Sequence, residues 1–452
     1  MKLVFFGLVL FLGMLLPAAA FEQTYWVWQR TAPLQPSEAA DLKAAGVTRL
    51  YWQAGMLKRD GADWRWAERF QIDWTALRAA APGIAIIPVV RIEASTDSTF
   101  PVPSRAVLIR LLNQVATAAG AGTLQIDHET PDRLMPEYID FLKQLKESGR
   151  PWRLSISALG HWSHEAKLLA PYVDEITPMF YDLNPAPLRL EAGGLPSLIE
   201  PTLEKQLAAW KGCPLPWLAG LPNFSRITIM DTAGKSRGNL RSWYWETIFF
   251  APFLEAVKPT EQGQMLFTVS RAATLGVTPV LAHEQVIIRY PDRAALREAQ
   301  NASAAAGAKG AIYFRLADSG DPSGYSVRDL ASTKAESPAL KLSRDSSGRF
   351  VLTNDSAVDL MPVVRDKESR GYTLEVDAGA PVWREVIAGG FATAHLGKRT
   401  GLGAAQLEFR FAHLVAGQSL TTGYIGEAGG SAATIRWRVR NLEKDDLWHA
   451  LK

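Results

Sequence analysis

Residues 122–131 read Gly-Thr-Leu-Gln-Ile-Asp-His-Glu-Thr-Pro, an apolar approach followed by two acids and a Thr-Pro stop. Because alternate residues of a β-strand share a face, Gln125, Asp127 and Glu129 are expected to project together. Two neighbouring carboxyl groups push each other's pKa values apart, which can keep one protonated as a general acid near neutral pH. The stretch predicts a buried strand with a functional polar cluster at its carboxyl end. The plainer interpretation is a solvated strand end with two acids.

Strand-like apolar segments alternate with helical segments from residue 24 to about residue 316. Eight such alternations are typical of a (β/α)8 barrel of the TIM type. A doubly wound open sheet is the alternative, but no Gly-x-Gly-x-x-Gly follows the first strand, which disfavours its nucleotide-binding version. The candidate strands are Tyr25–Trp28, Arg49–Trp52, Ile84–Ile92, Thr123–Asp127, Arg153–Ala158, Glu175–Tyr181, Trp217–Leu221 and Ala311–Leu316.

The regular alternation is broken late in the chain. Residues 223–278 are irregular for a barrel, and a long insertion after a late barrel strand usually builds one wall of the active-site cleft. Residues 321–340, rich in Ser, Pro, Asp and Lys, are typical of a linker. Short segments of period two follow. The sequence therefore predicts a barrel domain at 21–335 and a small C-terminal β-sandwich at 341–452.

The first 20 residues have the pattern of a signal peptide. Lys2 precedes an apolar stretch from Leu3 to Leu16, and Ala18-Ala19-Ala20 fits a small-residue cleavage site. The apolar stretch is short for a membrane span, and no later segment is apolar enough for one. We therefore expect an exported protein, periplasmic or secreted, without a membrane span.

Composition narrows the class of partner. The 49 Lys and Arg residues nearly balance the 46 Asp and Glu residues, so nothing indicates a nucleic-acid partner. With Cys213 as the only cysteine and no metal-ligand spacing, we expect neither a metal nor a cofactor. The 15 tryptophans, 12 of them before residue 246, favour a cleft that stacks sugar rings. Trp28 and Trp52, at the ends of the first two strands, are the candidates for substrate contact. The oligomeric state stays open.

Other strand ends also carry polar side chains, and in a (β/α)8 barrel the carboxyl ends of the strands hold the reactive groups. The sixth predicted strand leads into Met179-Phe180-Tyr181-Asp182, and the eighth carries Arg315 near its end. The third predicted strand adds Arg91 and Glu93. We expect the side chains at the ends of the sixth and eighth strands to contact substrate beside the Asp127–Glu129 pair. Each of them could equally be a structural residue of the barrel rim.

Two of these motifs resemble the chitinase-like (family 18) glycoside hydrolases. Residues 122–131 are similar to the strand-four signature Asp-Gly-x-Asp-x-Asp-x-Glu-x-Pro, and residues 179–182 to the strand-six Met-x-Tyr-Asp. Gly122 and Gln125 depart from the signature, because they stand where it has its first two aspartates. Over its whole length the chain also resembles an uncharacterised domain-of-unknown-function family of exported bacterial proteins, which implies a barrel and no particular activity.

The resemblance implies specific roles. Glu129 would protonate the glycosidic oxygen, and Asp127 would orient the substrate's 2-acetamido group, which attacks in place of a protein nucleophile. Tyr181 would hydrogen-bond that group, and Asp182 would line the sugar subsite, with Gln125, Met179 and Arg315 nearby. The sequence thus predicts a glycoside hydrolase acting on an extracellular or envelope polysaccharide of bacteria, with N-acetylhexosamine as the first choice. The alternatives are a non-catalytic glycan-binding barrel and a structural or assembly protein of the envelope.

Overall fold

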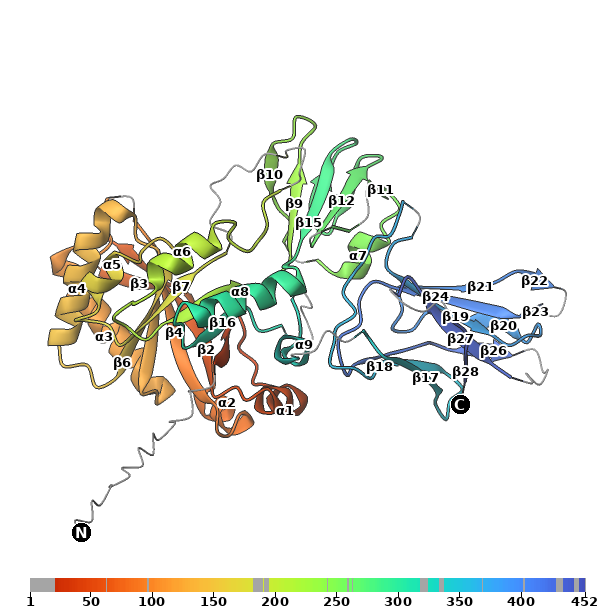
Figure 1. Ribbon diagram of the computed structural model, residues 1–452, viewed down its shortest axis with the longest axis horizontal. Coiled ribbons are helices and arrows are strands. Elements are labelled where there is room, and N and C mark those ends of the chain that lie inside the picture. Colours follow the sequence, from red (N-terminus) through yellow and green to blue (C-terminus); the bar gives the residue numbers. More distant parts are fainter. Residues whose placement is uncertain are drawn as a thin grey trace, which may run out of the picture.

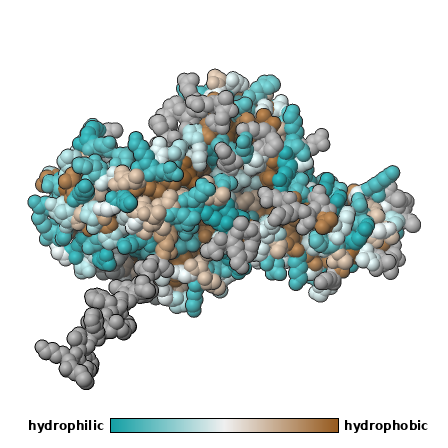
Figure 2. All heavy atoms as spheres, in the orientation of Figure 1, coloured by the Kyte–Doolittle hydropathy of each residue, from teal (hydrophilic) through white to brown (hydrophobic). Residues whose placement is uncertain are grey.

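The computed structural model describes most of the chain after residue 20. The described residues are 21–61, 63–95, 97–181, 190, 195–241, 243–257, 260–261, 263–317, 324–332, 337–367, 369–400, 403–427, 434–442 and 447–451. The predicted signal peptide and Asp182 lie outside them. Three bodies are visible in Figure 1: a barrel with its helices, a second sheet beside it, and a C-terminal all-β part. Hydrophilic side chains cover most of the face in Figure 2, with hydrophobic ones in small patches.

Eight parallel strands close into a barrel, because β1 pairs with β2 on one side and with β16 on the other. The predicted (β/α)8 architecture is confirmed, and every predicted strand corresponds to one barrel strand. In the order of the sheet these are β1 (Glu22–Val27), β16 (Gly310–Phe314), β8 (Leu218–Pro222), β7 (Glu175–Met179), β6 (Arg153–Leu159), β5 (Thr123–Asp127), β4 (Ala85–Ile92) and β2 (Arg49–Asp60).

Helices follow the strands and cover the outside of the barrel (Figure 1). The helix α3 (Val102–Ala119) shows how local sequence ends a helix: it stops before Gly120, whose φ of +59° suits a residue without a Cβ. One more strand, β3 (Asp63–Arg69), folds back antiparallel on β2. The helices of this region are α1 (Pro36–Ala44), α2 (Trp74–Ala80), α3 (Val102–Ala119), η1 (Asp132–Leu134), α4 (Met135–Glu147), α5 (Glu165–Leu169), α6 (Leu203–Trp210), α8 (Arg293–Ala305) and α9 (Val327–Ala331). None of the described helices combines the length and hydropathy of a membrane span.

Polar side chains fill the lower barrel interior in a connected ladder. The guanidinium of Arg49 contacts the carboxylate of Glu175 at 2.6 Å, which also accepts a hydrogen bond of 3.1 Å from Ser155. Gln125 donates to Ser155 at 3.1 Å and accepts from the indole N–H of Trp26 at 2.6 Å. Since buried polar groups are costly without partners, this chain of bonds fixes each member, including the Trp26 ring at its upper end.

The insertion between β8 and β16 is a folded unit, where the sequence suggested only irregular structure. Five antiparallel strands form its sheet, and one face carries α7 (Trp245–Phe249), whose Trp245 and Phe249 are fully buried. The strands in sheet order are β10 (Ser236–Asn239), β9 (Arg226–Met230), β15 (Gln285–Arg289), β12 (Gln264–Val269) and β11 (Leu254–Ala256). A small hairpin, β13 (Ala273–Leu275) with β14 (Thr278–Val280), completes it.

The C-terminal region is a β-sandwich, as the period-two segments predict. Its three antiparallel sheets surround an apolar core that includes Trp383 and Trp437, both nearly inaccessible, so Trp437 is a core residue. The first sheet has β17 (Leu340–Arg344), β18 (Phe350–Asn354) and β25 (Ser419–Thr421). The second has β21 (Thr393–Leu396), β24 (Gln406–Phe411), β19 (Tyr372–Asp377), β27 (Arg436–Arg440) and β28 (His449–Ala450). The third has β22 (Arg399–Thr400), β23 (Gly403–Ala404), β20 (Trp383–Val386) and β26 (Ile425–Glu427).

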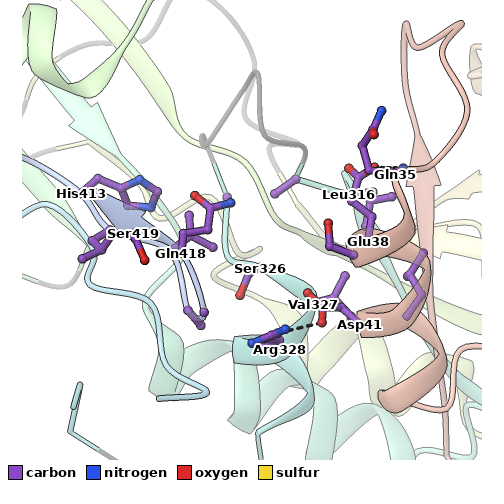
Figure 3. A pocket seen from close by; sticks show the side chains of 18 of the residues that line it. Gln35, Glu38, Asp41, Leu316, Ser326, Val327, Arg328, His413, Gln418 and Ser419 are labelled. Atoms are coloured by element: carbon purple, nitrogen blue, oxygen red, sulfur yellow. Dashed lines mark hydrogen bonds and ion pairs between the residues drawn. The ribbon is translucent and has the colours of Figure 1, made fainter. Parts of the chain in front are cut away.

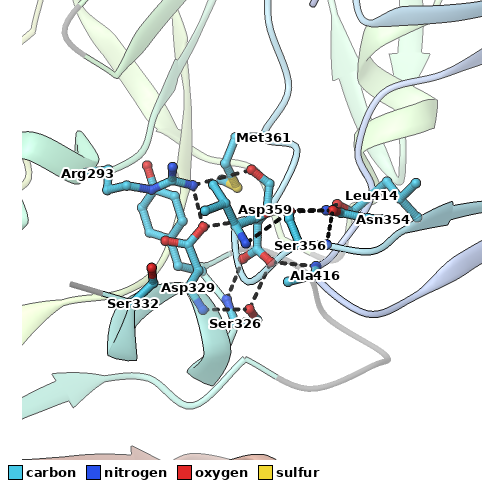
Figure 4. Close-up of polar contacts among 12 residues, drawn as sticks. Arg293, Ser326, Asp329, Ser332, Asn354, Ser356, Asp359, Met361, Leu414 and Ala416 are labelled. Atoms are coloured by element: carbon cyan, nitrogen blue, oxygen red, sulfur yellow. Dashed lines mark hydrogen bonds and ion pairs between the residues drawn. The ribbon is translucent and has the colours of Figure 1, made fainter. Parts of the chain in front are cut away.

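The sandwich docks on the rest of the chain through specific polar contacts (Figure 4). The carboxylate of Asp359 accepts hydrogen bonds from the backbone and hydroxyl of Ser326, at 2.6 and 2.8 Å. Arg370 donates to the carbonyl of Leu254 in the inserted sheet at 2.6 Å. The first contact joins the sandwich to the start of α9 and the second joins it to β11, so the barrel and its insertion share one junction with the sandwich.

Candidate active site

A cavity of about 330 Å³ opens at the carboxyl end of the barrel, where the strand ends converge. Its polar lining consists of two carboxyl and two guanidinium groups, and its apolar lining is almost entirely aromatic. The polar residues are Arg91, Asp127, Glu129 and Arg226; the others are Trp26, Trp28, Met179, Tyr181 and Phe314. Five of the eight barrel strands, or the segments directly after them, contribute one or two residues each, so the cavity belongs to the barrel end as a whole.

The strand β5 presents its two acids to this cavity as period two requires. Asp127, its last residue, and Glu129 both line the cavity. His128 points the other way, into the helix layer, where its ring lies 5.1 Å from that of Tyr138 on α4. The predicted shared face of Asp127 and Glu129 is therefore present, and Tyr181 lines the same cavity.

Both acids hold their protons more tightly than they would in water. Burial raises the pKa of Asp127, opposed by a 2.7 Å hydrogen bond from the Ser157 hydroxyl and by the charge of Arg91. Burial between the pocket walls also raises the pKa of Glu129, and the neighbouring charge of Asp127 raises it further, while Arg91 lowers it. Glu129 remains accessible from the cavity. Its carboxyl can thus carry a proton toward a ligand, which is the property a general acid needs.

The aromatic wall is organised around Phe314, at the end of β16. The ring of Trp28 meets it edge-on at 5.3 Å, and the ring of Tyr181 stacks on it at 5.9 Å with 17° between the planes. Trp26 lies 6.1 Å from it and is held by its bond to Gln125. Flat rings with polar edges match the apolar faces of pyranose sugars, so this wall suits a saccharide.

Of the other predicted site residues, some line the cavity and others do not. Trp28 and Met179 line the cavity. Gln125 is fully buried below it, and its amide is used by Trp26, Ser155 and Thr177, so its position supports the floor and makes no contact with the cavity. Arg315 follows Phe314 but is not among the lining residues; its carbonyl accepts a 2.9 Å bond from Asn223. Asp182 lies outside the described residues.

Trp52 has a structural position, which corrects the expectation that it contacts substrate. Its side chain faces the helix layer, fully buried in one cluster with Leu42 of α1 and Leu77 of α2. Its indole N–H donates to the carbonyl of Arg30 at 2.8 Å. The neighbouring Tyr51 faces the barrel interior instead.

Four lining residues were not among the predicted site residues. Trp26, Arg226 and Phe314 were not proposed, and Arg91 had been noted only as a strand-end polar group. Trp26 has a signal in the sequence, because it precedes Trp28 by two residues and so shares its face. Arg226 has none, because it belongs to β9 of the inserted sheet and reaches the cavity only through the fold. The insertion does contribute to the pocket wall, as expected from its place after a late barrel strand.

A second cavity, of about 390 Å³, lies where the sandwich meets the barrel. Figure 3 shows His413, Gln418 and Ser419 of the sandwich on one side and Glu38 and Asp41 of α1 on the other. Two of its carboxylates are already paired, Glu38 with Arg30 at 2.6 Å and Asp41 with Arg328 at 2.7 Å. No Trp, Tyr or Phe is among its described lining residues. The aromatic cavity of the barrel is therefore the better candidate for chemistry.

Comparison with known proteins gives no relative by sequence: no family model and no curated protein matches the chain. Among solved structures, the C-terminal domain of a putative chitinase from Desulfitobacterium hafniense DCB-2 is 14% identical, with a TM-score of 0.46 over 66% of this chain and 94% of that one. A glycoside hydrolase family 18 N-acetylglucosaminidase from Paenibacillus barengoltzii is 14% identical, with a TM-score of 0.43 over 66% and 95%. The spore cortex-lytic enzyme of Bacillus cereus is 14% identical, with a TM-score of 0.44 over 65% and 70%. Sequence identities and TM-scores this low carry no argument about activity. Any argument about function therefore has to rest on the pocket itself.

Proposed function

We propose that this protein is a glycoside hydrolase that cleaves a bacterial extracellular or envelope polysaccharide containing N-acetylhexosamine, with Glu129 as the general acid. One observation carries the proposal: Asp127 and Glu129 enter the same aromatic-lined cavity from one strand end, and both have raised pKa values. A protonated carboxyl beside an aromatic wall is the pairing that glycosidic bond cleavage requires. The predicted signal peptide would deliver the enzyme to such a polymer outside the cytoplasm.

The arrangement of the acids favours participation of the substrate itself. A protein nucleophile and a general acid must flank the sugar from opposite sides, about 5 Å apart or more. Both described carboxyl groups of the cavity come from the same strand end, so neither faces the other across a ring. The 2-acetamido oxygen of the sugar would then bond to the anomeric carbon as the glycosidic C–O bond breaks and Glu129 protonates the departing oxygen.

The second half of the reaction uses the same residues. A water molecule would attack the anomeric carbon and give a proton to Glu129, which restores the acid, while the acetamido group re-forms. Asp127 would hold the acetamido N–H during both steps. Its hydrogen bond from Ser157 keeps its carboxyl oriented. Tyr181, directly after β7, would donate to the acetamido oxygen.

Glu129→Gln tests the assignment, because the amide keeps the shape of the side chain and removes the proton donor. We expect hydrolysis of tetra-N-acetylchitotetraose to fall by about 10²-fold or more, the scale of general-acid loss, with the Kd nearly unchanged. Glu93→Gln is the matched control, since Glu93 pairs with Lys58 at 3.0 Å and does not line the cavity. Equal activity of wild type and Glu129→Gln would contradict the proposal.

One observation favours a second candidate, a barrel that binds glycan without cleaving it. Gln125 stands directly below Asp127, where an ionisable neighbour could share a proton, and its neutral amide is fully engaged in hydrogen bonds. Wild-type protein that retains chito-oligosaccharides but releases no product from them would favour this function. The aromatic wall would serve both candidates equally.

A further inference from the structure

The guanidinium group of Arg91 occupies a position in the cavity that the hydrolytic scheme does not use. Arg91 lies on β4 directly beside Asp127, its register partner on β5, and it is exposed to solvent at the cavity. A rim residue next to the acid pair is where a substituent of the bound sugar would pass.

Arg91 differs from several other arginines of the barrel, because no carboxylate of the described residues holds it in an ion pair. Arg49, Arg105 and Arg150 are each held by a carboxylate within 3.2 Å. No hydrogen bond or ion pair of this kind joins Arg91 to any residue within the described ranges. Its positive charge acts on Asp127 and Glu129 through space and lowers the pKa of both. Its five N–H donors are therefore available to a ligand, and a guanidinium binds a carboxylate in a planar, two-point geometry.

Protonation of the general acid also favours an anion beside Arg91. The described lining carries the carboxyl groups of Asp127 and Glu129, and the charge of Arg91 acts on both. A general acid has to be protonated before it reacts, so in the reactive state Glu129 no longer offers Arg91 a negative charge. A carboxylate on the bound sugar would supply that charge in a partly desolvated site, where opposite charges attract more strongly than in water.

We propose that the natural substrate carries a carboxylate, on a uronic acid or on a lactyl ether, and that Arg91 is the residue that selects it. This inference rests on the proposed function, since it names the substrate class for the same pocket. The selecting contact would be a salt bridge from the Arg91 guanidinium to the carboxylate of the sugar next to the cleaved bond.

Two matched pairs of probes separate charge from shape. The first is a hyaluronan tetrasaccharide and the same compound with its carboxylates reduced to alcohols. The second is a tetrasaccharide of alternating N-acetylglucosamine and N-acetylmuramic acid and tetra-N-acetylchitotetraose, which lacks the lactyl group. Calorimetry on the full chain gives a Kd for each member. We expect at least one acidic member to bind about tenfold more tightly than its neutral partner, and the pair that responds identifies the source of the carboxylate.

The variant Arg91→Gln should abolish that preference by weakening the acidic member alone. Arg65→Gln is the control of equal charge change, because Arg65 is exposed on β3 and pairs with Asp60 at 3.0 Å, away from the cavity. It should keep the full preference. The preference of wild type should also shrink at high salt, because screening weakens an accessible ion pair.

Two outcomes would overturn the inference. In one, wild type binds both neutral members as tightly as their acidic partners; in the other, Arg91→Gln weakens acidic and neutral members equally. Either result leaves the hydrolase proposal standing if Glu129→Gln still loses activity on neutral chitotetraose. Failure of all four saccharides to bind would instead contradict the proposed function, and the inference with it.

Discussion

The backbone amide of Asp359 donates a hydrogen bond of 2.7 Å to the carboxyl group of Asp329, which joins the sandwich to α9. Arg293 contacts the same carboxyl oxygen, and the other oxygen of Asp329 is buried without a partner among the described residues. The Asp359 carboxylate lies in the same site and accepts from Ser326 and from the amide of Ala416 (Figure 4). Burial, and then the charge of Asp359, raise the pKa of Asp329 to about 7, against the opposing charge of Arg293.

This site should make stability depend on pH. An aspartate in the unfolded chain has a pKa near 4, so between about pH 4 and about pH 7 the folded protein binds a proton that the unfolded chain releases. The free energy of unfolding should therefore fall as pH rises through this window, by roughly one to a few kcal/mol, and level off above it. Thermal unfolding followed by tryptophan fluorescence from pH 4.5 to 8.5 measures the effect.

Asp329→Asn isolates the contribution of this carboxyl, since the amide cannot ionise. Relative to wild type, the variant should lose less Tm between pH 5 and pH 8. Asp355→Asn is a suitable control, because Asp355 is exposed directly after β18 in the sandwich. Parallel Tm curves for wild type and Asp329→Asn would show that Asp329 does not titrate in this range.

Ser157→Ala should shift the pH profile of the reaction. The hydroxyl of Ser157 lowers the pKa of Asp127 through its hydrogen bond, so its removal lets burial raise that pKa further. We expect kcat/KM to fall about tenfold and its acidic limb to move to higher pH. If kcat/KM fell equally at every pH and the acidic limb of the profile stayed at the same pH, the result would indicate loss of structure alone. Ser148→Ala, at the end of α4, provides the reference.

Two tryptophan variants should separate sugar stacking from packing. Trp28→Ala removes a ring from the cavity wall, so we expect glycan affinity to drop by about 1 kcal/mol or more, with little change in Tm. Trp52→Phe loses a buried hydrogen bond and part of a core ring, so Tm should fall while the Kd stays the same. The reverse pattern, with affinity following Trp52, would remove the aromatic wall from substrate binding.

The sequence predicts which face of a strand a side chain lies on better than it predicts how deep in the barrel that side chain lies. Period two correctly puts Asp127 and Glu129 into one cavity. It cannot show that Gln125, on the same face, lies deeper in the barrel, where its side chain is fully buried and accepts a hydrogen bond from Trp26.

In the strand β2, Leu50, Tyr51 and Trp52 are all buried. Period two puts Tyr51 on the face of Arg49, which lies in the barrel interior, and leaves Trp52 on the other face with Leu50. Parity therefore argues against Trp52 as a substrate contact.

Residues 223–289 were harder to predict because their order comes from antiparallel pairing, which leaves a weak periodic signal in short strands. Residues 231–235 are the connection between β9 and β10, and the Lys235-Ser236 pair, whose likeness to part of a phosphate loop lacks the first glycine, lies where this connection enters β10. The carboxylate of Asp231 accepts from the amides of Ala233 and Lys235, at 2.9 and 2.8 Å, which is turn chemistry. Arg226 reaches the cavity only because this sheet folds against the barrel end.

Closure of the barrel has a consequence for how the chain folds. The first strand, β1, pairs along its length with β16, from Glu22 against Gly310 to Trp26 against Phe314. During synthesis, β1 therefore emerges long before its partner, and the whole inserted sheet has to be made in between. Pairings so distant in sequence are slow to form, and the exposed edges of β1 and β8 can meanwhile pair with other strands. Chaperones that shield strand edges during this interval should raise the yield of native protein more than those that act after release from the ribosome.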